Sequence, residues 1–402
     1  MTQISSRLSK IEASKTLQVK EKALELKTKG IDVVDLTAGE PDFNTPENIC
    51  LAGIEAIKKG FTKYTANTGI PKLREAICDK LKKDDDLTFS PDQIVVSNGA
   101  KQSILNALFA LLNENDEVIL PMPYWVSYPE QIKLAGGIPA IIDTTKKEFK
   151  LSADDLAKKL NPRTKAIILN SPCNPTGIVY TADELSKLAK VLEKHDLWII
   201  SDEIYEKIIF DGLKHTSIAT FGNLIQKSII INGFSKSHAM TGWRLGYSAA
   251  PLNITKAMSK IQSHYTSNAS SISQQAGLAA LQTPDLEIEK MRSTFEKRRN
   301  LVLSFLKKRD YFSFAYPQGA FYFFVKVSDV FGSRINGQII DDSVKFSSYI
   351  TENFHVVTVP GIAFGTDEYI RISFATSNEQ IQKGMEKLIS AMDNLMSLKK
   401  SS

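Results

Sequence analysis

The sequence predicts an α/β protein with a large domain, in which helices flank a mostly parallel sheet, and a smaller α+β domain. Two observations support this prediction. Short β-branched runs alternate with amphipathic helical patterns before residue 290, as in sheets whose strands are joined by crossover helices. Beyond that point, a long charged helical stretch gives way to separate strand patterns, which are typical of a second, α+β unit.

The elements can be followed along the chain. Thr45 is predicted to cap a helix that has Pro46 at its first position and ends at Gly60. A capping box from Thr181 to Glu184 predicts the start of another helix. The other predicted helices are 19–26, 101–112, 126–135 and 287–308, with a final amphipathic helix after them. The predicted strands are 94–96, 117–120, 166–169, 197–200, 228–231, 321–327, 356–359 and 369–374. Polar residues at the ends of such strands are candidates for a site, because ligands bind there in parallel sheets.

Composition narrows the classes of function. The formal net charge of +5 is spread along the chain without a dense Lys/Arg cluster, so we expect no nucleic-acid partner. The start has no apolar core of signal-peptide length, and the longest apolar stretch, 104–112, is too short to span a bilayer. Three cysteines without a CxxC motif favour a reducing compartment. We therefore expect a soluble, cytoplasmic protein without a membrane partner or a metal.

Lys236 is the most informative candidate residue. It follows Ser235 shortly after the apolar run 229–231, where a buried strand is predicted to end, and Arg244 stands eight residues further on. A lysine there can form a Schiff base with an aldehyde cofactor. The hydroxyl and the guanidinium can hold the phosphate of that cofactor. The alternative is a lysine and an arginine on a solvated loop.

Three further motifs follow predicted strands. Residues 99–101 open a helix, whose backbone N–H groups can cradle a phosphate. Asn174 stands between two prolines in the segment 171–177, a rigid turn that presents its side chain. Trp125 can stack on a planar ring. Each motif also has a plain structural interpretation as a helix start, a tight turn or a core aromatic, so only the combination indicates a site.

Two charged residues complete the set. Asp202 ends an apolar strand, where a carboxylate is costly unless it is paired, and a protonated pyridine nitrogen would be a suitable partner. Residues 199–203 also resemble a Walker B strand, but no glycine is followed by lysine, so the phosphate loop of an ATPase is missing. Arg371 alternates with apolar neighbours in a strand, and its guanidinium suits bidentate binding of a carboxylate. A surface arginine is the alternative.

Together these motifs resemble the class I aminotransferases of pyridoxal 5'-phosphate (PLP) fold type I, in the branch of bacterial aspartate aminotransferases. The resemblance begins at residues 36–43, includes Lys63-Tyr64 and residues 69–71, and ends beyond Arg371. Gly-x-Gly, HExxH and GxSxG motifs are absent from the sequence, which removes the usual signatures of dinucleotide enzymes, zinc proteases and serine hydrolases. The resemblance implies a large PLP-binding domain over residues 47–290 and a small domain built from both termini, 1–46 and 291–402.

The resemblance also implies roles for individual residues. Lys236 would carry the cofactor and move a proton, Asp202 would keep the pyridine nitrogen protonated, and Tyr205 would bind the phenolic oxygen. The implied cofactor-binding residues are Gly99, Ala100, Lys101, Trp125, Asn174, Asp202, Tyr205, Ser235, Lys236, Arg244 and, from the other subunit of a homodimer, Tyr64. The implied substrate-binding residues are Gly39, Lys101, Trp125, Asn174 and Arg371.

One departure concerns substrate selection. Another branch of aspartate aminotransferases binds the distal carboxylate with an arginine of the partner subunit, but residues 263–273 contain no Arg or Lys. In the branch that this chain resembles, Lys101 is the better candidate for that contact, helped by residues 14–16. Cys173 stands where asparagine is often found, and we expect little consequence from this difference.

We therefore expect an aspartate:2-oxoglutarate aminotransferase that works by a ping-pong cycle in a homodimer with shared active sites. The nearest alternative is the same chemistry on aromatic amino acids or prephenate. A PLP-dependent lyase or decarboxylase would form product without an oxo-acid acceptor. A non-enzymatic PLP-binding regulator would carry a winged-helix domain before the PLP domain, and motifs that begin by residue 36 leave no room for one.

Overall fold

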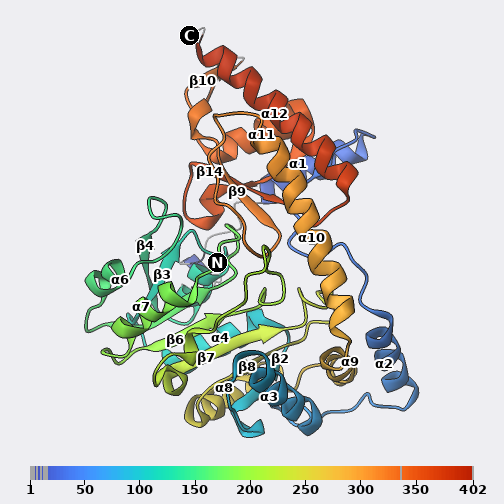
Figure 1. Ribbon diagram of the computed structural model, residues 1–402, viewed down its shortest axis with the longest axis vertical. Helices are drawn as coiled ribbons and strands as arrows, with labels where there is room; N and C mark the ends of the chain where they lie inside the picture. Colours follow the sequence, from blue (N-terminus) through green and yellow to red (C-terminus); the bar gives the residue numbers. More distant parts are fainter. Residues whose placement is uncertain (1–4, 6–7, 10, 12–16, 336, 401–402) are drawn as a thin grey trace.

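The computed structural model describes residues 5, 8–9, 11, 17–335 and 337–400. The larger part of the chain is built around a seven-stranded sheet, and the smaller part packs helices on a three-stranded sheet (Figure 1). The long helix α10 (Asp285–Leu306) runs from one part to the other. The prediction of a sheet flanked by helices and joined to a smaller α+β unit is confirmed. The boundaries predicted near residues 46 and 290 stay a prediction.

The large sheet is mostly parallel, because only β8 runs against its two neighbours. In spatial order its strands are β2 (Ile94–Ser97), β8 (Gly246–Ala249), β7 (Ser228–Gly233), β6 (Trp198–Asp202), β5 (Thr164–Asn170), β3 (Glu117–Met122) and β4 (Ile138–Asp143). The carboxyl ends of β5, β6 and β7 therefore meet at one edge, where such sheets bind ligands.

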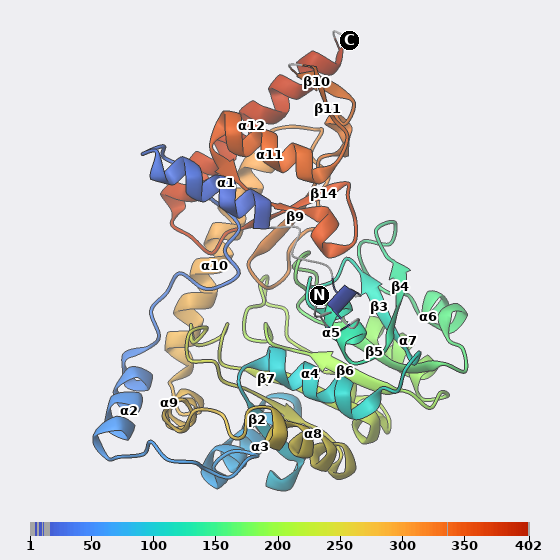
Figure 2. The ribbon, with the colours of Figure 1, turned by 180° about the vertical axis from the view of Figure 1, so that it is seen from behind.

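Successive residues of the central strands enter different cores, which explains why these strands are apolar throughout. Ile168 and Ile200 pack with α4 (Ala100–Leu111), while Ile167 and Ile199 pack with α7 (Ala182–Leu192) on the opposite face. Figure 2 shows α4 on the near side of the sheet. The face of α4 also carries α5 (Tyr128–Leu134) and α8 (Leu252–Tyr265), and the other face carries α3 (Pro71–Asp85), α6 (Ala153–Lys159) and α9 (Ser271–Leu281).

The smaller part combines both ends of the chain. The strand β1 (Val34–Asp35) pairs in parallel with β12 (Val356–Val357), so the N-terminal segment joins the C-terminal core. The three-stranded sheet consists of β13 (Val359–Pro360), β14 (Tyr369–Ser373) and β9 (Tyr322–Lys326), and all its pairings are antiparallel. The remaining elements are α1 (Leu17–Thr28), α11 (Ser343–Phe354), α12 (Asn378–Lys400) and the antiparallel pair β10 (Ser333–Ile335) and β11 (Gln338–Ile340).

Two predictions about elements are wrong. The strand predicted over 356–359 is divided between β12 and β13, which pair with different strands. Thr45 does not cap α2 (Glu47–Lys58), whose N-cap residue is Pro46. Its hydroxyl instead donates to the Ala239 carbonyl at 2.7 Å and accepts from the Trp243 indole at 3.0 Å. The Thr45 hydroxyl therefore forms hydrogen bonds with residues distant in sequence instead of capping the helix.

Other local predictions hold. The capping box is confirmed, because the Thr181 hydroxyl accepts from the backbone N–H of Glu184 and the Glu184 carboxylate accepts from that of Thr181. Gly60 follows α2 with a φ of 68°, a conformation that favours glycine. Over the part of the chain that the structure describes, no helix has the length and apolar character needed to cross a membrane.

Candidate active site

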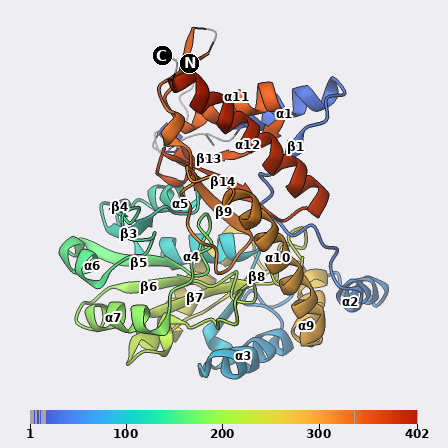
Figure 3. The same cartoon turned by 45° about the horizontal axis from the view of Figure 1, so that its top comes forward.

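A cavity of about 540 Å³ lies at the carboxyl ends of β5, β6 and β7 and is also lined by residues of β9 and β14. Figure 3 shows β9 and β14 above the large sheet. The sequence-predicted residues that line it are Gly39, Ala100, Lys101, Trp125, Asn174, Asp202, Tyr205, Ser235, Lys236, Arg244 and Arg371. Gly99 lies beside Ala100 at the start of α4. Residues that are up to several hundred positions apart in sequence are thus brought to one site.

Lys236 follows the end of β7 and lines the cavity. Its Nζ donates to the Gly39 carbonyl at 2.5 Å. Burial lowers the pKa of the Lys236 ammonium to about 8, although Glu40 raises it, and the guanidinium groups of Arg371 and Arg244 lower it further. A lysine with a pKa near neutrality is neutral often enough to act as a nucleophile and a base.

Asp202 is the last residue of β6, and its side chain is buried. Its Oδ2 accepts from the Tyr128 hydroxyl at 2.6 Å, and its Oδ1 accepts from the backbone N–H of Ile204 at 3.2 Å. Burial raises the pKa of the Asp202 carboxyl to about 6, and the hydrogen bond from Tyr128 opposes that rise. The carboxylate therefore faces the cavity with one side-chain donor and one backbone donor.

Tyr205 is buried beside Tyr322, which comes from β9, and their hydroxyl oxygens lie 2.9 Å apart. The Tyr322 ring also lies beneath the Arg371 guanidinium, with 4.3 Å between Cζ and the ring centroid. Burial raises the pKa of Tyr205 and of Tyr322, so both phenols stay protonated at neutral pH. Tyr322 thus connects a predicted cofactor residue with a predicted substrate residue.

Arg371 extends from β14 into the cavity and is buried. Its Nη1 donates to the Asn174 side-chain oxygen at 3.0 Å, and its Nη2 donates to the Thr37 carbonyl at 2.8 Å. Its Nε is buried without a hydrogen-bond partner, and burial lowers the pKa of the guanidinium. A buried arginine held by neutral groups suits an incoming carboxylate.

The start of α4 and Arg244 form another wall of the cavity. A Cβ atom on Gly99, whose φ is 83°, would lie 2.6 Å from Nη2 of Arg244. A Cβ on Gly246 of β8 would lie 2.3 Å from the backbone nitrogen of Ala100. Only glycines allow this close approach of the helix start, the strand and the guanidinium. Backbone N–H groups at a helix start and a guanidinium are the groups that bind phosphate.

Lys101 and Trp125 lie together at the side of the cavity. The Lys101 Nζ is 4.8 Å from the centre of the Trp125 indole. Burial lowers the pKa of Lys101, and the nearby Arg244 lowers it further. The indole meets the Tyr128 ring edge-on, with centroids 5.3 Å apart. Among the described residues, no carboxylate forms an ion pair with Lys101, so its ammonium is available to a ligand.

Tyr64 is the predicted site residue that lies apart from this cavity. It is 89% exposed and lines a separate surface hollow with Lys63, Asn268 and Ser271. Its predicted contact was with the other subunit, which is not part of the structure. The N-terminal residues 14–16, which the sequence suggested as a help to Lys101, lie outside the described residues.

The sequence missed two residues that contact predicted ones. Tyr128 binds Asp202 and Tyr322 binds Tyr205. Tyr128 stands three residues after Trp125, a helical spacing that gives no hint of a carboxylate partner. Tyr322 lies in the aromatic run Phe321–Phe324, and such a run is typical of a buried strand rather than of a functional site.

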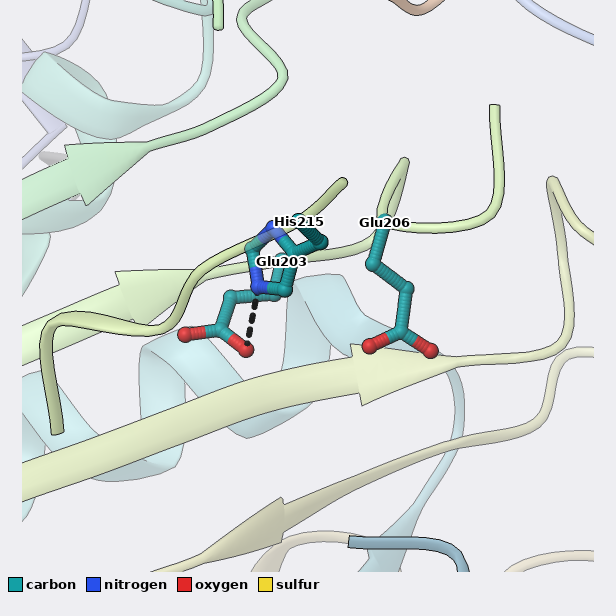
Figure 4. Close-up of side chains that lie close together, drawn as sticks. All are labelled: Glu203, Glu206 and His215. Atoms are coloured by element: carbon teal, nitrogen blue, oxygen red, sulfur yellow. Dashed lines mark ion pairs between the residues drawn. The ribbon is translucent and has the colours of Figure 1, made fainter. Parts of the chain in front are cut away.

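A second group of ionisable residues lies behind the cavity. The ligand atoms of Glu203, Glu206 and His215 all lie within 4.8 Å of one another, and Figure 4 shows the His215 imidazole over the Glu203 carboxylate, with Glu206 to one side. His215 Nε2 lies 3.0 Å from Glu203, and the Lys80 ammonium lies 2.5 Å from Glu206. Because the lysine already neutralises Glu206, this group is best described as a buried ion-pair network that joins α3 to the end of β6.

Comparisons with known proteins agree with this geometry. Residues 31–388 match the family of aminotransferases of class I and II. A Rickettsia conorii protein named probable aspartate/prephenate aminotransferase is 46% identical over 397 residues, which cover 98% of this chain and 99% of that protein. The aspartate aminotransferase of Bacillus subtilis is 44% identical over 387 residues, which cover 96% of this chain and 98% of that protein.

Solved structures give the same result. The aspartate aminotransferase from Rhizobium meliloti matches with a TM-score of 0.94 at 39% identity, covering 98% of this chain and 99% of that one. The aspartate aminotransferase from Thermus thermophilus with maleate matches with a TM-score of 0.91 at 37% identity, covering 97% and 100%. The fold is therefore PLP fold type I, and this chain belongs to the class I and II aminotransferases, in the branch of the bacterial aspartate aminotransferases.

Proposed function

We propose that this aminotransferase moves the amino group of L-aspartate to 2-oxoglutarate, with PLP as its cofactor, in a ping-pong cycle of two half-reactions. The observation that carries the proposal is the charge of one cavity. Four cations line it, Lys101, Lys236, Arg244 and Arg371, against two carboxylates, Glu40 and the buried Asp202. Confined cations favour anionic ligands, and the cofactor phosphate and the two carboxylates of aspartate are such ligands.

Two observations support the fit of PLP. Both donors to the buried Asp202 are neutral, the Tyr128 hydroxyl and the Ile204 N–H, so a protonated ring nitrogen would supply a counter-charge in direct contact with the carboxylate. The close approach of Gly99 to the Arg244 guanidinium makes a wall of donors that suits a phosphate. When bound, PLP supplies an aldehyde that accepts an amino group and a ring that withdraws electrons from the substrate.

The side chains of the cavity would have different roles in cofactor binding and proton transfer. Lys236 attaches the cofactor and moves a proton at the substrate Cα, which its lowered pKa allows. Asp202 holds the ring nitrogen in its protonated form, and Trp125 covers the ring. The groups proposed for the phenolic oxygen are Tyr205 and Asn174, and those proposed for the phosphate are Ser235, Arg244 and the backbone of Gly99, Ala100 and Lys101.

Two basic residues would recognise the substrate. Arg371 binds the α-carboxylate, because its buried guanidinium is held by the neutral oxygens of Asn174 and Thr37, and Gly39 lies beside it. Lys101 binds the distal carboxylate. The stretch 263–273, where another branch of the family has an arginine for this contact, contains no Arg or Lys. Relatives named for aspartate and for aspartate/prephenate support a dicarboxylate substrate, so prephenate is the second candidate amino acceptor.

A substrate panel tests this proposal. The purified protein would be assayed with 2-oxoglutarate and aspartate, tyrosine, phenylalanine, kynurenine or alanine, and with prephenate plus aspartate or glutamate. We expect the highest kcat/KM with aspartate. A higher value with phenylalanine or tyrosine would show an aromatic aminotransferase instead. Product without an oxo-acid acceptor would show a lyase or decarboxylase, and bound PLP without turnover would show a regulator.

We further propose a homodimer with shared active sites. Tyr64 is 89% exposed, and the side chains of Leu51, Ile54 and Ile57 on α2 are also exposed, at 51%, 46% and 55%. A stripe of this kind on one helix is typical of a face that another chain covers.

The free cysteines support a reducing, cytoplasmic location. We also propose residues 47–290 as the large domain, with 1–46 and 291–402 as the small one.

Heterodimers test the shared site. If Tyr64 completes the phosphate site of its neighbour, a Lys236→Ala subunit paired with a Tyr64→Phe subunit forms one site with both native residues. We expect such heterodimers to bind PLP at one site per dimer with the affinity of the native protein. A monomer that is active and stable, or Tyr64→Phe homodimers with native PLP affinity, would contradict the proposal.

A further inference from the structure

Tyr128 is a buried phenol at the first position of α5, and both its hydroxyl and its ring contact residues of the active site. Its hydroxyl donates to Asp202 Oδ2 at 2.6 Å, which is within the range of charge-assisted hydrogen bonds. Its ring meets the Trp125 indole at 80°, with centroids 5.3 Å apart. One side chain therefore contacts both the buried carboxylate and the aromatic wall of the cavity.

The Asp202 carboxylate has few other means of stabilisation. The second donor is a backbone N–H, that of Ile204, at a longer 3.2 Å. Lys236 is the cation that faces Asp202 across the cavity, while Glu203 opposes its ionisation. Tyr205 and Cys173 are the other titratable groups around Tyr128, and burial keeps both neutral. Tyr128 is thus the side-chain donor on which the ionised form of Asp202 depends.

We propose that Tyr128 is a positioning residue that keeps Asp202 ionised and aimed at the cofactor ring, so that the ring nitrogen rather than the carboxylate carries the proton. This inference rests on the proposed place of Asp202 opposite that nitrogen. Without the donor, the carboxylate is more basic, and the proton that it shares with the nitrogen moves towards oxygen. The protein then loses the protonated ring that withdraws electrons from the substrate.

The size of this effect follows from the hydrogen bond. A bond to a charged group is strong enough to shift the preference of a shared proton about ten- to a hundred-fold. The substitution Tyr128→Phe removes the hydroxyl and keeps the ring against Trp125, so it separates the proton effect from the packing effect. We expect kcat to fall by about the same factor, while the KM for aspartate changes little, because substrate carboxylates do not contact Tyr128 in this scheme.

The test is the ¹⁵N chemical shift of the ring nitrogen in holoenzyme prepared with ¹⁵N-labelled PLP. Native protein and Tyr180→Phe should give the shift of a protonated nitrogen, and Tyr128→Phe should move towards the unprotonated value. Tyr180 is the matched control, because it is also a buried tyrosine, but its hydroxyl accepts from the Leu151 N–H at 2.8 Å and does not face Asp202. An unchanged shift and an unchanged kcat in Tyr128→Phe would overturn the inference.

Two more variants keep the test decisive. In Asp202→Asn the shift should move at least as far as in Tyr128→Phe. If Asp202→Asn leaves it unchanged, Asp202 does not face the nitrogen, and the proposed site has failed rather than the role of Tyr128. Placing 4-aminophenylalanine at residue 128 keeps the ring and restores a donor at the same position. This variant should recover the protonated shift, and a failure to do so would also overturn the inference.

Discussion

Removing the Lys101 ammonium should reduce the use of aspartate and spare that of phenylalanine. Lys101 is the second residue of α4, and its Nζ lies 4.8 Å from the Trp125 ring at the side of the cavity. Burial and the neighbouring Arg244 lower its pKa. An anion placed beside this ammonium would therefore be bound by a charge that has no acidic partner among the described residues.

The magnitude follows from the type of contact. A hydrogen bond between a lysine and a carboxylate contributes about 1.5–3 kcal/mol. Each 1.4 kcal/mol is about a factor of ten, so losing the contact corresponds to about a ten- to hundred-fold loss in kcat/KM. The side chain of Lys101 is still partly exposed, and solvent screening places the expected loss near the lower end of this range. Phenylalanine has no distal carboxylate, so its rate should change little.

The assay is the single-turnover half-reaction of the PLP form of Lys101→Ala with aspartate and with phenylalanine. This design is needed because the usual acceptor, 2-oxoglutarate, is itself a dicarboxylate and would be affected in a full cycle. Lys133→Ala is a suitable control, since Lys133 lies on the neighbouring helix α5 and pairs with Glu130. If both amino acids lose rate together, Lys101 serves the cofactor or the fold. If neither amino acid loses rate, Lys101 does not bind the distal carboxylate.

Three other changes have expected outcomes. Asp202→Asn should retain PLP affinity but slow the half-reaction with aspartate by orders of magnitude, because a neutral amide does not favour the protonated ring; near-native turnover would mean that this carboxylate has another role. In PLP-free protein, trace acetylation of Lys236 followed by mass spectrometry should titrate with a midpoint near pH 8, as the lowered pKa requires, and a midpoint near 10.5 would contradict the burial argument. His215→Ala should lower the free energy of unfolding by about 3–5 kcal/mol, because it leaves the Glu203 carboxylate buried without its cationic partner, although the hydroxyls of Ser201 and Ser217 still donate to it. Burial lowers the pKa of His215, but Glu203 raises it more. Burial raises the pKa of Glu203, but His215 and two serine hydroxyls lower it more. The contribution of the pair should therefore be present between the lowered pKa of Glu203 and the raised pKa of His215 and lost on either side; a denaturation series across pH checks both statements.

The reacting groups could be predicted from the sequence because each lies at, or a few residues beyond, the end of a strand. An apolar β-branched run fixes where a buried strand lies, and polar residues near its carboxyl end then fall at the edge of the sheet where ligands bind. Lys236 follows β7 in this way, Asp202 ends β6, and Asn174 follows β5. The family resemblance added the roles of these residues, which the pattern alone does not contain.

The residues that orient these groups could not be predicted in the same way. Tyr128 is 74 positions from Asp202, and Tyr322 is 117 positions from Tyr205. Such contacts depend on how helices and sheets pack, and no local spacing encodes them. Two strands of the large sheet, β4 (Ile138–Asp143) and β8 (Gly246–Ala249), were also not predicted. The antiparallel partners on both sides of β8 are distant in sequence from it or are themselves fixed by the tertiary fold.

Burial shifts the ionisable groups of the cavity towards their neutral forms. It lowers the pKa values of Lys101, Lys236 and Arg371, and it raises that of Asp202. Each group therefore carries a cost of desolvation that a ligand of opposite charge would offset. A substrate with one carboxylate offsets the cost at Arg371 and leaves that at Lys101. Aspartate offsets both, so the preference for a dicarboxylate depends on how far Lys101 is removed from water as well as on its charge.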